Sequence, residues 1–233
     1  MTDLETIATV QSPFKERFGI PRQPGLVSAH GSLLMQPGFD DPVMFDGLDE
    51  FSHIWVTFVF HASADQGWKA KVRPPRLGGK RQVGVFASRS PHRPNFLGLS
   101  LLKLEGVQTT KPVHLKVSGL DLLDGTPIID IKPYVAYSDA VPDARSGFAA
   151  QIPAPTQTVV FSDNVRSVLN TRPNAEADEQ LIRQVLSLDP RPAYKKRRIT
   201  ERLFGVLLDD FEMKWRVDGD VTEVVELNLK EKT

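Results

Sequence analysis

The chain has 233 residues, of which 40% are hydrophobic and 25% charged, and its 29 Lys and Arg residues balance 29 Asp and Glu residues. This composition is typical of a globular protein that buries a core without disulfides or metals. The absence of cysteine excludes disulfides, thiolate zinc sites and cysteine nucleophiles. No basic signal-peptide segment opens the chain, and the longest apolar run, 54–60, is far shorter than the roughly 20 residues of a membrane helix. We therefore expect a soluble, cytoplasmic protein.

Residues 1–137 alternate short apolar segments with separators rich in Gly, Pro and Asp. This pattern predicts a β-barrel or sandwich with one short helix over 42–51. The run 53–60 is apolar at nearly every position, so we expect it to be buried on both faces. The predicted strands span 5–10, 30–35, 53–60, 84–87, 100–105, 114–118 and 128–134.

The composition changes after residue 137. Residues 138–159 are rich in Ala, Pro, Ser and Asp and are interpreted as a linker. Apolar residues at helical spacing then predict helices over 163–170 and 176–188, and alternation predicts strands over 203–208, 211–217 and 221–228. The expected fold is mainly β: an N-terminal β-barrel (1–137), the linker (138–159) and a smaller α+β C-terminal domain (160–233).

Charge is segregated along this neutral chain. No acidic residue occurs between Asp65 and Glu105, whereas the same stretch holds nine cations. A second basic group lies near the C-terminus. Such clusters either bind a polyanion or are solvated loop charges. The two groups are Lys69, Lys71, Arg73, Arg76, Lys80, Arg81, Arg89, Arg93 and Lys103, and then Arg191, Lys195, Lys196, Arg197 and Arg198.

Three segments are candidate binding loops. Residues 88–100 set Arg89, His92, Arg93 and Asn95 around two prolines, which stiffen the backbone. Residues 19–25 (GIPRQPG) carry an amide that can read a nucleobase edge, and residues 119–127 (GLDLLDGTP) carry two carboxylates suited to a cation or to ribose hydroxyls. Each segment is also compatible with an ordinary turn.

Common nucleotide-binding and hydrolase motifs are absent from the sequence. No G-x-G-x-x-G, Walker A or G-x-S-x-G segment occurs, and the five histidines lack metal-ligand spacing. We therefore expect no metal, and we interpret His53 and His61 as core histidines.

Six segments together resemble the TsaA/TrmO family over almost the full length. They are SPFKERFGIPRQPGL, FSHIWVTFVFH, VRPPRLGG, GVFASRSPHRPNFLGLS, DLLDGTPIIDIKPY and DPRPAY, in the family's order. The resemblance implies a β-barrel methyltransferase that uses S-adenosylmethionine. It implies methylation of N6 of threonylcarbamoyladenosine (t6A) at position 37 of tRNA, which gives m6t6A. It also implies a homodimer with cofactor sites near the subunit contact.

The resemblance assigns residues by motif. One departure is Asn95-Phe96-Leu97-Gly98 where the family often has N-P-I-G, which should loosen that loop slightly. The cofactor-binding residues implied are Gln23, Pro24, Gly25, His61, Ala62, Arg89, Leu99, Asp121, Leu122, Leu123 and Asp124.

The transferred methyl group requires N6 to lose a proton, and the acceptor is left open among His61, Asp121, Asp124, a backbone carbonyl and the substrate's own carboxylate. Arginine and lysine suit the threonyl carboxylate and the tRNA phosphates. The predicted tRNA contacts are Arg76, Lys80, Arg81 and Arg93, with Lys195, Lys196 and Arg197 in the second domain.

Other readings stay open at this point. The protein could methylate a small molecule with the same fold, or it could be a non-enzymatic RNA-binding barrel. The C-terminal domain could hold tRNA phosphates, mediate dimerisation or cap the barrel.

Overall fold

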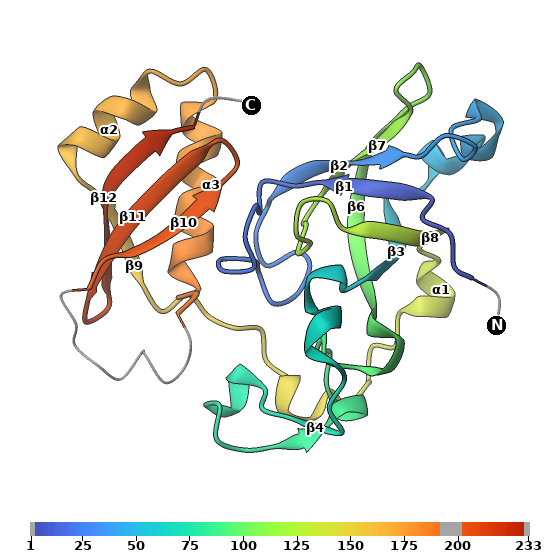
Figure 1. Cartoon of the computed structure of the whole chain (residues 1–233), viewed down its shortest axis with the longest axis horizontal. Helices are drawn as coiled ribbons and strands as arrows, with labels where there is room; N and C mark the ends of the chain where they lie inside the picture. Colours follow the sequence, from blue (N-terminus) through green and yellow to red (C-terminus); the bar gives the residue numbers. More distant parts are fainter. Residues whose placement is uncertain (1–2, 192–201, 231–233) are drawn as a thin grey trace.

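The computed structural model describes residues 3–191 and 202–230. Its N-terminal part is a closed barrel of antiparallel strands in the order β1-β2-β7-β6-β3-β8 (Figure 1). The predicted mainly β fold with an N-terminal barrel is confirmed. The barrel strands are β1 (Ala8–Gln11), β2 (His30–Met35), β3 (His53–Val59), β6 (Leu97–Gln108), β7 (His114–Ser118) and β8 (Pro127–Pro133).

The barrel is filled by the alternate side chains of its strands. In β3, Ile54, Val56 and Phe58 are at most 4% exposed, whereas the residues between them are partly exposed. The expectation that this run is buried on both faces was wrong. Successive side chains of a strand point to opposite faces, and the outer face of β3 is only partly covered, by contacts such as Trp55 Nε1 donating to Asp139 Oδ2 at 3.0 Å.

A long connection, residues 60–96, joins β3 to β6. It contains β4 (Lys71–Val72), which pairs with β5 (Val83–Gly84) in a two-stranded arm. The predicted strand over 84–87 was therefore mostly wrong, because the chain turns after Gly84 and Ser88 N donates to Val85 O. The 3₁₀ turns of this connection are η3 (His61–Gln66), η4 (Pro75–Leu77), η5 (Val85–Ala87) and η6 (Pro94–Phe96).

The helix predicted over 42–51 is two short 3₁₀ turns, η1 (Pro42–Phe45) and η2 (Leu48–Glu50). Gly47 separates them with a left-handed φ of 79°, a conformation that glycine adopts at little cost and that breaks a helix. Beyond the barrel, the chain passes through α1 (Ala136–Asp139) and η7 (Gly147–Ala149).

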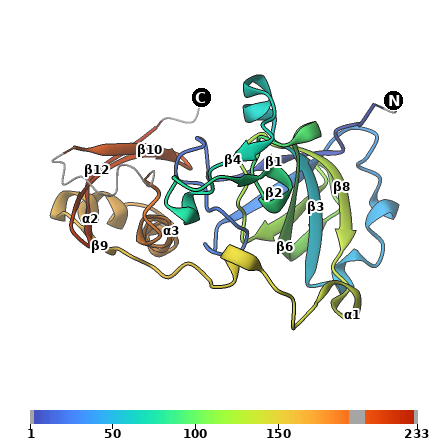
Figure 2. The same cartoon turned by 90° about the horizontal axis from the view of Figure 1, so that it is seen from below.

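The second part is a four-stranded sheet in the order β10-β11-β12-β9, with both of its helices on one face (Figure 2). The first strand, β9, runs parallel to β12 and begins at Thr158, within the stretch interpreted as linker. Ser162 Oγ caps α2 by accepting from Val165 N. The elements are β9 (Thr158–Phe161), α2 (Asp163–Asn170), α3 (Ala175–Ser187), β10 (Phe204–Leu208), β11 (Phe211–Asp218) and β12 (Val221–Leu229).

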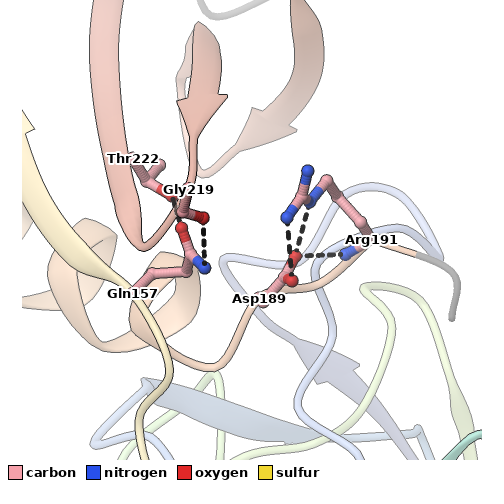
Figure 3. Close-up of polar contacts among 5 residues, drawn as sticks. All are labelled: Gln157, Asp189, Arg191, Gly219 and Thr222. Atoms are coloured by element: carbon pink, nitrogen blue, oxygen red, sulfur yellow. Dashed lines mark hydrogen bonds and ion pairs between the residues drawn. The ribbon is translucent and has the colours of Figure 1, made fainter. Parts of the chain in front are cut away.

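Polar contacts fix the chain where it enters this second part and where it continues after α3 (Figure 3). The Gln157 amide donates to Gly219 O and accepts from Thr222 Oγ1, at 3.4 and 2.9 Å. After α3, Arg191 donates Nε and Nη2 to the carboxylate of Asp189 at 2.8 and 3.1 Å, and both residues are only 5% exposed. Arg191 is thus a structural cation, enclosed in the fold instead of presented to a polyanion.

The two parts join through the β1–β2 connection, residues 12–29. Phe14 forms an isolated antiparallel bridge with Leu208, and Asp209 N donates to Pro13 O at 2.6 Å. Phe18 stacks on Trp215 with the ring centroids 5.8 Å apart. The connection therefore belongs to both cores.

None of the helices in residues 3–191 and 202–230 has the length and apolar character needed to cross a bilayer.

Gly31 in β2 is a test of barrel packing. A Cβ at this position would lie 2.2 Å from the backbone oxygen of Gln11 in the neighbouring strand, which cannot move without breaking the ladder. We expect Gly31→Ala to lower the free energy of unfolding by about 1–3 kcal/mol, as other overpacking substitutions do. Denaturant titration measures this change.

The matched control is Gly106→Ala in β6, where nothing lies within 4 Å of the added Cβ. Its stability should stay within about 1 kcal/mol of the parent. Equal stabilities of the two variants would contradict the packing described for the barrel.

Candidate active site

Two of the predicted loops meet at their glycines. Gly25 N, in the β1–β2 connection, donates to Gly119 O, in the β7–β8 connection, at 2.9 Å. Gly119 has a φ of 77°, and a Cβ there would lie 3.3 Å from Gly25 N. The left-handed backbone and the close approach both favour glycine. Segments more than ninety residues apart in the sequence are thereby brought into contact.

The third loop adds a guanidinium to this junction. Arg89 follows η5, and its Nη1 donates to Gln23 Oε1 at 2.6 Å. The Gln23 amide is oriented in turn, because its Nε2 donates to Arg22 O at 2.5 Å. Gln23 therefore fixes where the positive charge of Arg89 lies.

Asp121 is the carboxylate of the same cluster. Its Oδ1 accepts from Ser100 Oγ at 2.7 Å, and Ser100 is 1% exposed on β6. Burial raises the pKa of Asp121 to about 6, and the Ser100 hydrogen bond and the charge of Arg89 oppose that rise. A carboxyl group with this pKa can exchange a proton near neutral pH.

Asp124, predicted beside Asp121, makes contacts of a different kind. Its Oδ1 accepts from Ser12 N at 2.8 Å, and its Oδ2 lies 3.0 Å from Lys15 Nζ. Asp124 N also donates to Phe14 O at 2.8 Å. These bonds tie the two connections together, and its assignment to the cofactor stays a prediction.

The remaining predicted cofactor residues differ in how far their side chains are exposed to a ligand. Leu99 is 53% exposed on β6, whereas Leu122 is 2% exposed in the core, so only the backbone of Leu122 can contact a ligand. Leu123 O accepts from Thr126 Oγ1. Ala62 O accepts from Arg17 Nη1 at 3.0 Å, which links η3 to the β1–β2 connection that holds Gln23, Pro24 and Gly25.

The expectation that His53 and His61 are core histidines was wrong. Both rings are partly exposed. His53 lies on the outward face of β3, where its Nδ1 pairs with Ser52 Oγ at 2.9 Å, and His61 lies beyond the strand in η3. An apolar sequence neighbourhood does not bury a residue whose strand position points outward.

Ser100 is a site residue that pattern analysis missed. It interrupts the apolar sequence LGLSLL of β6 at a fully buried position. A buried hydroxyl needs a hydrogen-bond partner. A serine within an apolar strand was therefore the signal in the sequence that could have identified Ser100 as a site residue. The partner, Asp121, lies on the β7–β8 connection, distant from β6 in the pattern of the sequence.

The predicted tRNA contacts lie in different settings. Arg76, Lys80 and Arg81 are exposed around the β4–β5 arm. Arg93 is partly buried, and its Nη1 donates to Ser88 O at 3.0 Å, which braces the loop. Lys195, Lys196 and Arg197 lie outside the described residues. Within the described ranges, no group of three or more His, Asp or Glu side chains is arranged to hold a metal ion.

Together the three loops present a guanidinium, a carboxylate of raised pKa and an exposed leucine. This donor set suits a ligand that combines a carboxylate, a positive charge and an apolar ring, because each part finds a complementary group.

Known proteins match both parts of the chain. A model of the tRNA-methyltransferase O N-terminal domain matches residues 9–140, and a model of the TrmO C-terminal domain matches residues 154–230. The chain is 45% identical over 226 residues to the tRNA (adenine(37)-N6)-methyltransferase of Escherichia coli K12, covering 96% of each protein. A Pseudomonas aeruginosa protein whose name describes an S-adenosylmethionine-dependent methyltransferase (RcsF) is 45% identical, covering 90% of each.

The solved structures agree with these matches. A crystal structure of TrmO from Pseudomonas aeruginosa superposes with a TM-score of 0.79 at 36% identity, covering 98% of this chain and 97% of that one. The resemblance seen in the sequence is confirmed: the chain belongs to the tRNA-methyltransferase O family and is an S-adenosylmethionine-dependent methyltransferase.

Proposed function

We propose that the protein methylates N6 of adenosine 37 in tRNA, that this adenosine carries the threonylcarbamoyl group, and that the product is m6t6A. The Escherichia coli relative has the name of a tRNA (adenine(37)-N6)-methyltransferase. The observation that carries the proposal is the cluster of Arg89, Gln23 and Asp121. Arg89 belongs to a stretch that is rich in cations and has no acidic residue between Asp65 and Glu105.

The cluster is suited to S-adenosylmethionine, which when bound supplies a methyl group on a positively charged sulfur. Arg89 is placed to pair with a carboxylate, and Asp121 to face a positive charge or ribose hydroxyls. The exposed side chain of Leu99 offers an apolar surface for an adenine ring. Gln23 acts mainly by orienting Arg89.

Methyl transfer to N6 forms a carbon–nitrogen bond, breaks a carbon–sulfur bond and releases the proton of N6. The N6 lone pair is delocalised into the ring and the carbamoyl group, so a base near that proton assists the attack. We assign this role to Asp121, whose carboxylate accepts from Ser100 and forms no salt bridge within the described part of the chain, whereas Asp124 is bonded to Lys15 and Ser12. Its raised pKa suits proton transfer near neutral pH.

The substrate's threonyl carboxylate needs a cationic partner. Arg76, Lys80 and Arg81 are exposed, and within the described part of the chain they form no ion pair. An arginine or lysine without an acidic partner can bind an incoming carboxylate or phosphate without first breaking a bridge. The target lies in an anticodon loop, where a base is presented without opening a duplex.

A methyl-transfer assay tests the substrate directly. Labelled S-adenosylmethionine is incubated with tRNA that carries t6A and with the same tRNA lacking the modification. We expect label only in the modified tRNA, recovered as m6t6A after digestion. Label in unmodified tRNA alone would refute t6A as the substrate, and label in neither would refute the proposed function.

The role of Asp121 is tested by a pH profile. We expect wild-type kcat/KM to fall as the pH drops through about 6, where the carboxylate becomes protonated. Asp121→Asn should lose this inflection, and its rate at neutral pH should fall by roughly 10²–10⁴. Asp124→Asn is the matched control: it should unfold more easily, because it weakens the contact to Lys15, yet keep the inflection. An Asp121→Asn profile identical to wild type would exclude the assignment.

Stability gives an independent readout of the same group. Because burial holds the folded-state pKa above the unfolded value of about 3.9, the folded protein binds more protons between about pH 4 and pH 6. The contribution of Asp121 to the free energy of unfolding should therefore decrease as pH rises through this window, and the difference between wild type and Asp121→Asn isolates it. Asp121→Asn should be the more stable protein at neutral pH, and the difference should vanish at about pH 4.

We also propose, from the resemblance, that the protein is a homodimer that acts in the cytoplasm. Light scattering should give twice the 26.0 kDa of one chain. A monomer at working concentration would contradict the dimer.

A further inference from the structure

Two large aromatic side chains stand exposed at the base of the β4–β5 arm. Phe86 in η5 is 80% exposed and Trp68 is 59% exposed, whereas Val85, next to Phe86, is 3% exposed. The buried valine anchors the turn and leaves the phenylalanine ring in solvent. An isolated exposed apolar residue is ordinary, but two large exposed aromatic side chains at the base of one short arm point to a binding surface.

The two aromatics lie on chain segments that meet at the base of the arm. β4 and β5 are antiparallel with Lys71 opposite Gly84, and Val85 N continues the pairing by donating to Ala70 O at 3.0 Å. Ala70 and Val85 are therefore neighbours, and Trp68 and Phe86 follow close to them on the two segments. We call Trp68 and Phe86 the aromatic pair.

Exposed cations occur on the same arm as the aromatic pair. Lys69 and Lys71 are exposed on one side of the ladder, and Arg76, Lys80 and Arg81 are exposed farther along the arm. The nearest acidic residues in sequence are Asp65 and Glu105. Aromatic faces within a cationic surface are the combination that binds single-stranded nucleic acid, because bases stack on the rings while cations hold the backbone.

The aromatic pair is also tied to the cluster at the active site. Phe86 lies three residues before Arg89, and Lys69 N donates to His92 O at 3.1 Å. A nucleotide stacked on this surface is thus held at a fixed offset from the loop that carries Arg89. Figure 1 shows the arm below the barrel, with its tip extending toward the side on which the C-terminal part lies.

We propose that Trp68 and Phe86 stack on unpaired anticodon-loop bases flanking the target adenosine, and that this stacking places the adenosine at Asp121. The inference rests on the proposed function, because it takes tRNA as the substrate. Stacking is sequence-tolerant, so the aromatic pair contributes to affinity for the loop and the cations contribute the salt-dependent part of binding.

The test measures methyl transfer and filter binding with Phe86→Ala and Trp68→Ala. We expect each to raise KM and Kd for tRNA at least about five-fold, the lower end of the range for losing one base–aromatic stack. KM for S-adenosylmethionine should stay within about two-fold of wild type, and Phe86→Tyr should restore tRNA binding, since it keeps the ring.

Two further variants separate stacking from charge and from general surface effects. Arg81→Ala should flatten the dependence of tRNA binding on salt by about one ion, whereas Phe86→Ala should leave that slope unchanged. Tyr137→Ala removes an aromatic ring that is 94% exposed on α1, away from the arm in both views (Figures 1 and 2). It should leave KM for tRNA unchanged.

Three outcomes would overturn the proposal. One is tRNA binding by Phe86→Ala and Trp68→Ala indistinguishable from wild type. Another is an equal rise of KM for S-adenosylmethionine. The third is loss of oligomeric mass in light scattering parallel to the loss of tRNA binding, which would make the aromatic pair a subunit contact. Absence of methyl transfer by the wild-type protein would count against the proposed function, and filter binding would still decide the stacking.

Discussion

The packing of the β1–β2 connection between the barrel and the C-terminal sheet is the constraint on which the rest of the structure depends. Phe14 and Trp215 are both about 1% exposed, and each fully buried aromatic side chain contributes roughly 2–3 kcal/mol relative to exposure. The same connection carries Gln23 and Gly25, which contact Arg89 and Gly119. The hydrophobic contact between the two parts therefore also positions the polar cluster, because both use one segment of chain.

Charge and apolar surface are divided between connections and strands. The barrel strands supply most of the buried apolar side chains and the buried hydroxyls of Ser100 and Ser118, while the connections supply Arg89, Asp121 and the exposed cations of the arm. Burying Asp121 costs stability at neutral pH, because the charged carboxylate is favoured in water. The fold tolerates this cost in stability because Asp121 is hydrogen-bonded to Ser100 on β6, a strand of a closed barrel that does not move independently of its neighbours.

Much of the fold follows from local patterns in the sequence. The strands over 30–35 and 114–118 and the helix over 163–170 were predicted with their observed bounds, because alternation and helical spacing are local signals. The strand predicted over 84–87 was mostly wrong because Val85 and Phe86 resemble strand residues, whereas the bond from Ser88 N to Val85 O closes a turn. β9 was missed because its four residues pair with β12, more than sixty positions away.

The contacts of the site were harder to predict than the strands and helices, because they join residues that are distant in the sequence. Motifs identified the three loops, yet no local pattern joins Arg89 to Gln23 or Ser100 to Asp121, since those contacts arise only when the barrel closes. The sequence likewise did not separate Asp121 from Asp124, which differ in solvation and partners instead of in residue type.

The excursion of residues 60–96 begins and ends at one point of the barrel wall. Val59 pairs directly with Leu97, and Phe60 N donates to Phe96 O at 2.8 Å, so the barrel register is complete whatever the chain does in between. Loop-closure entropy grows only slowly with length. The β4–β5 arm can therefore change in length and surface without disturbing the barrel register, whereas Arg89, farther along the same excursion, must keep its place beside Gln23.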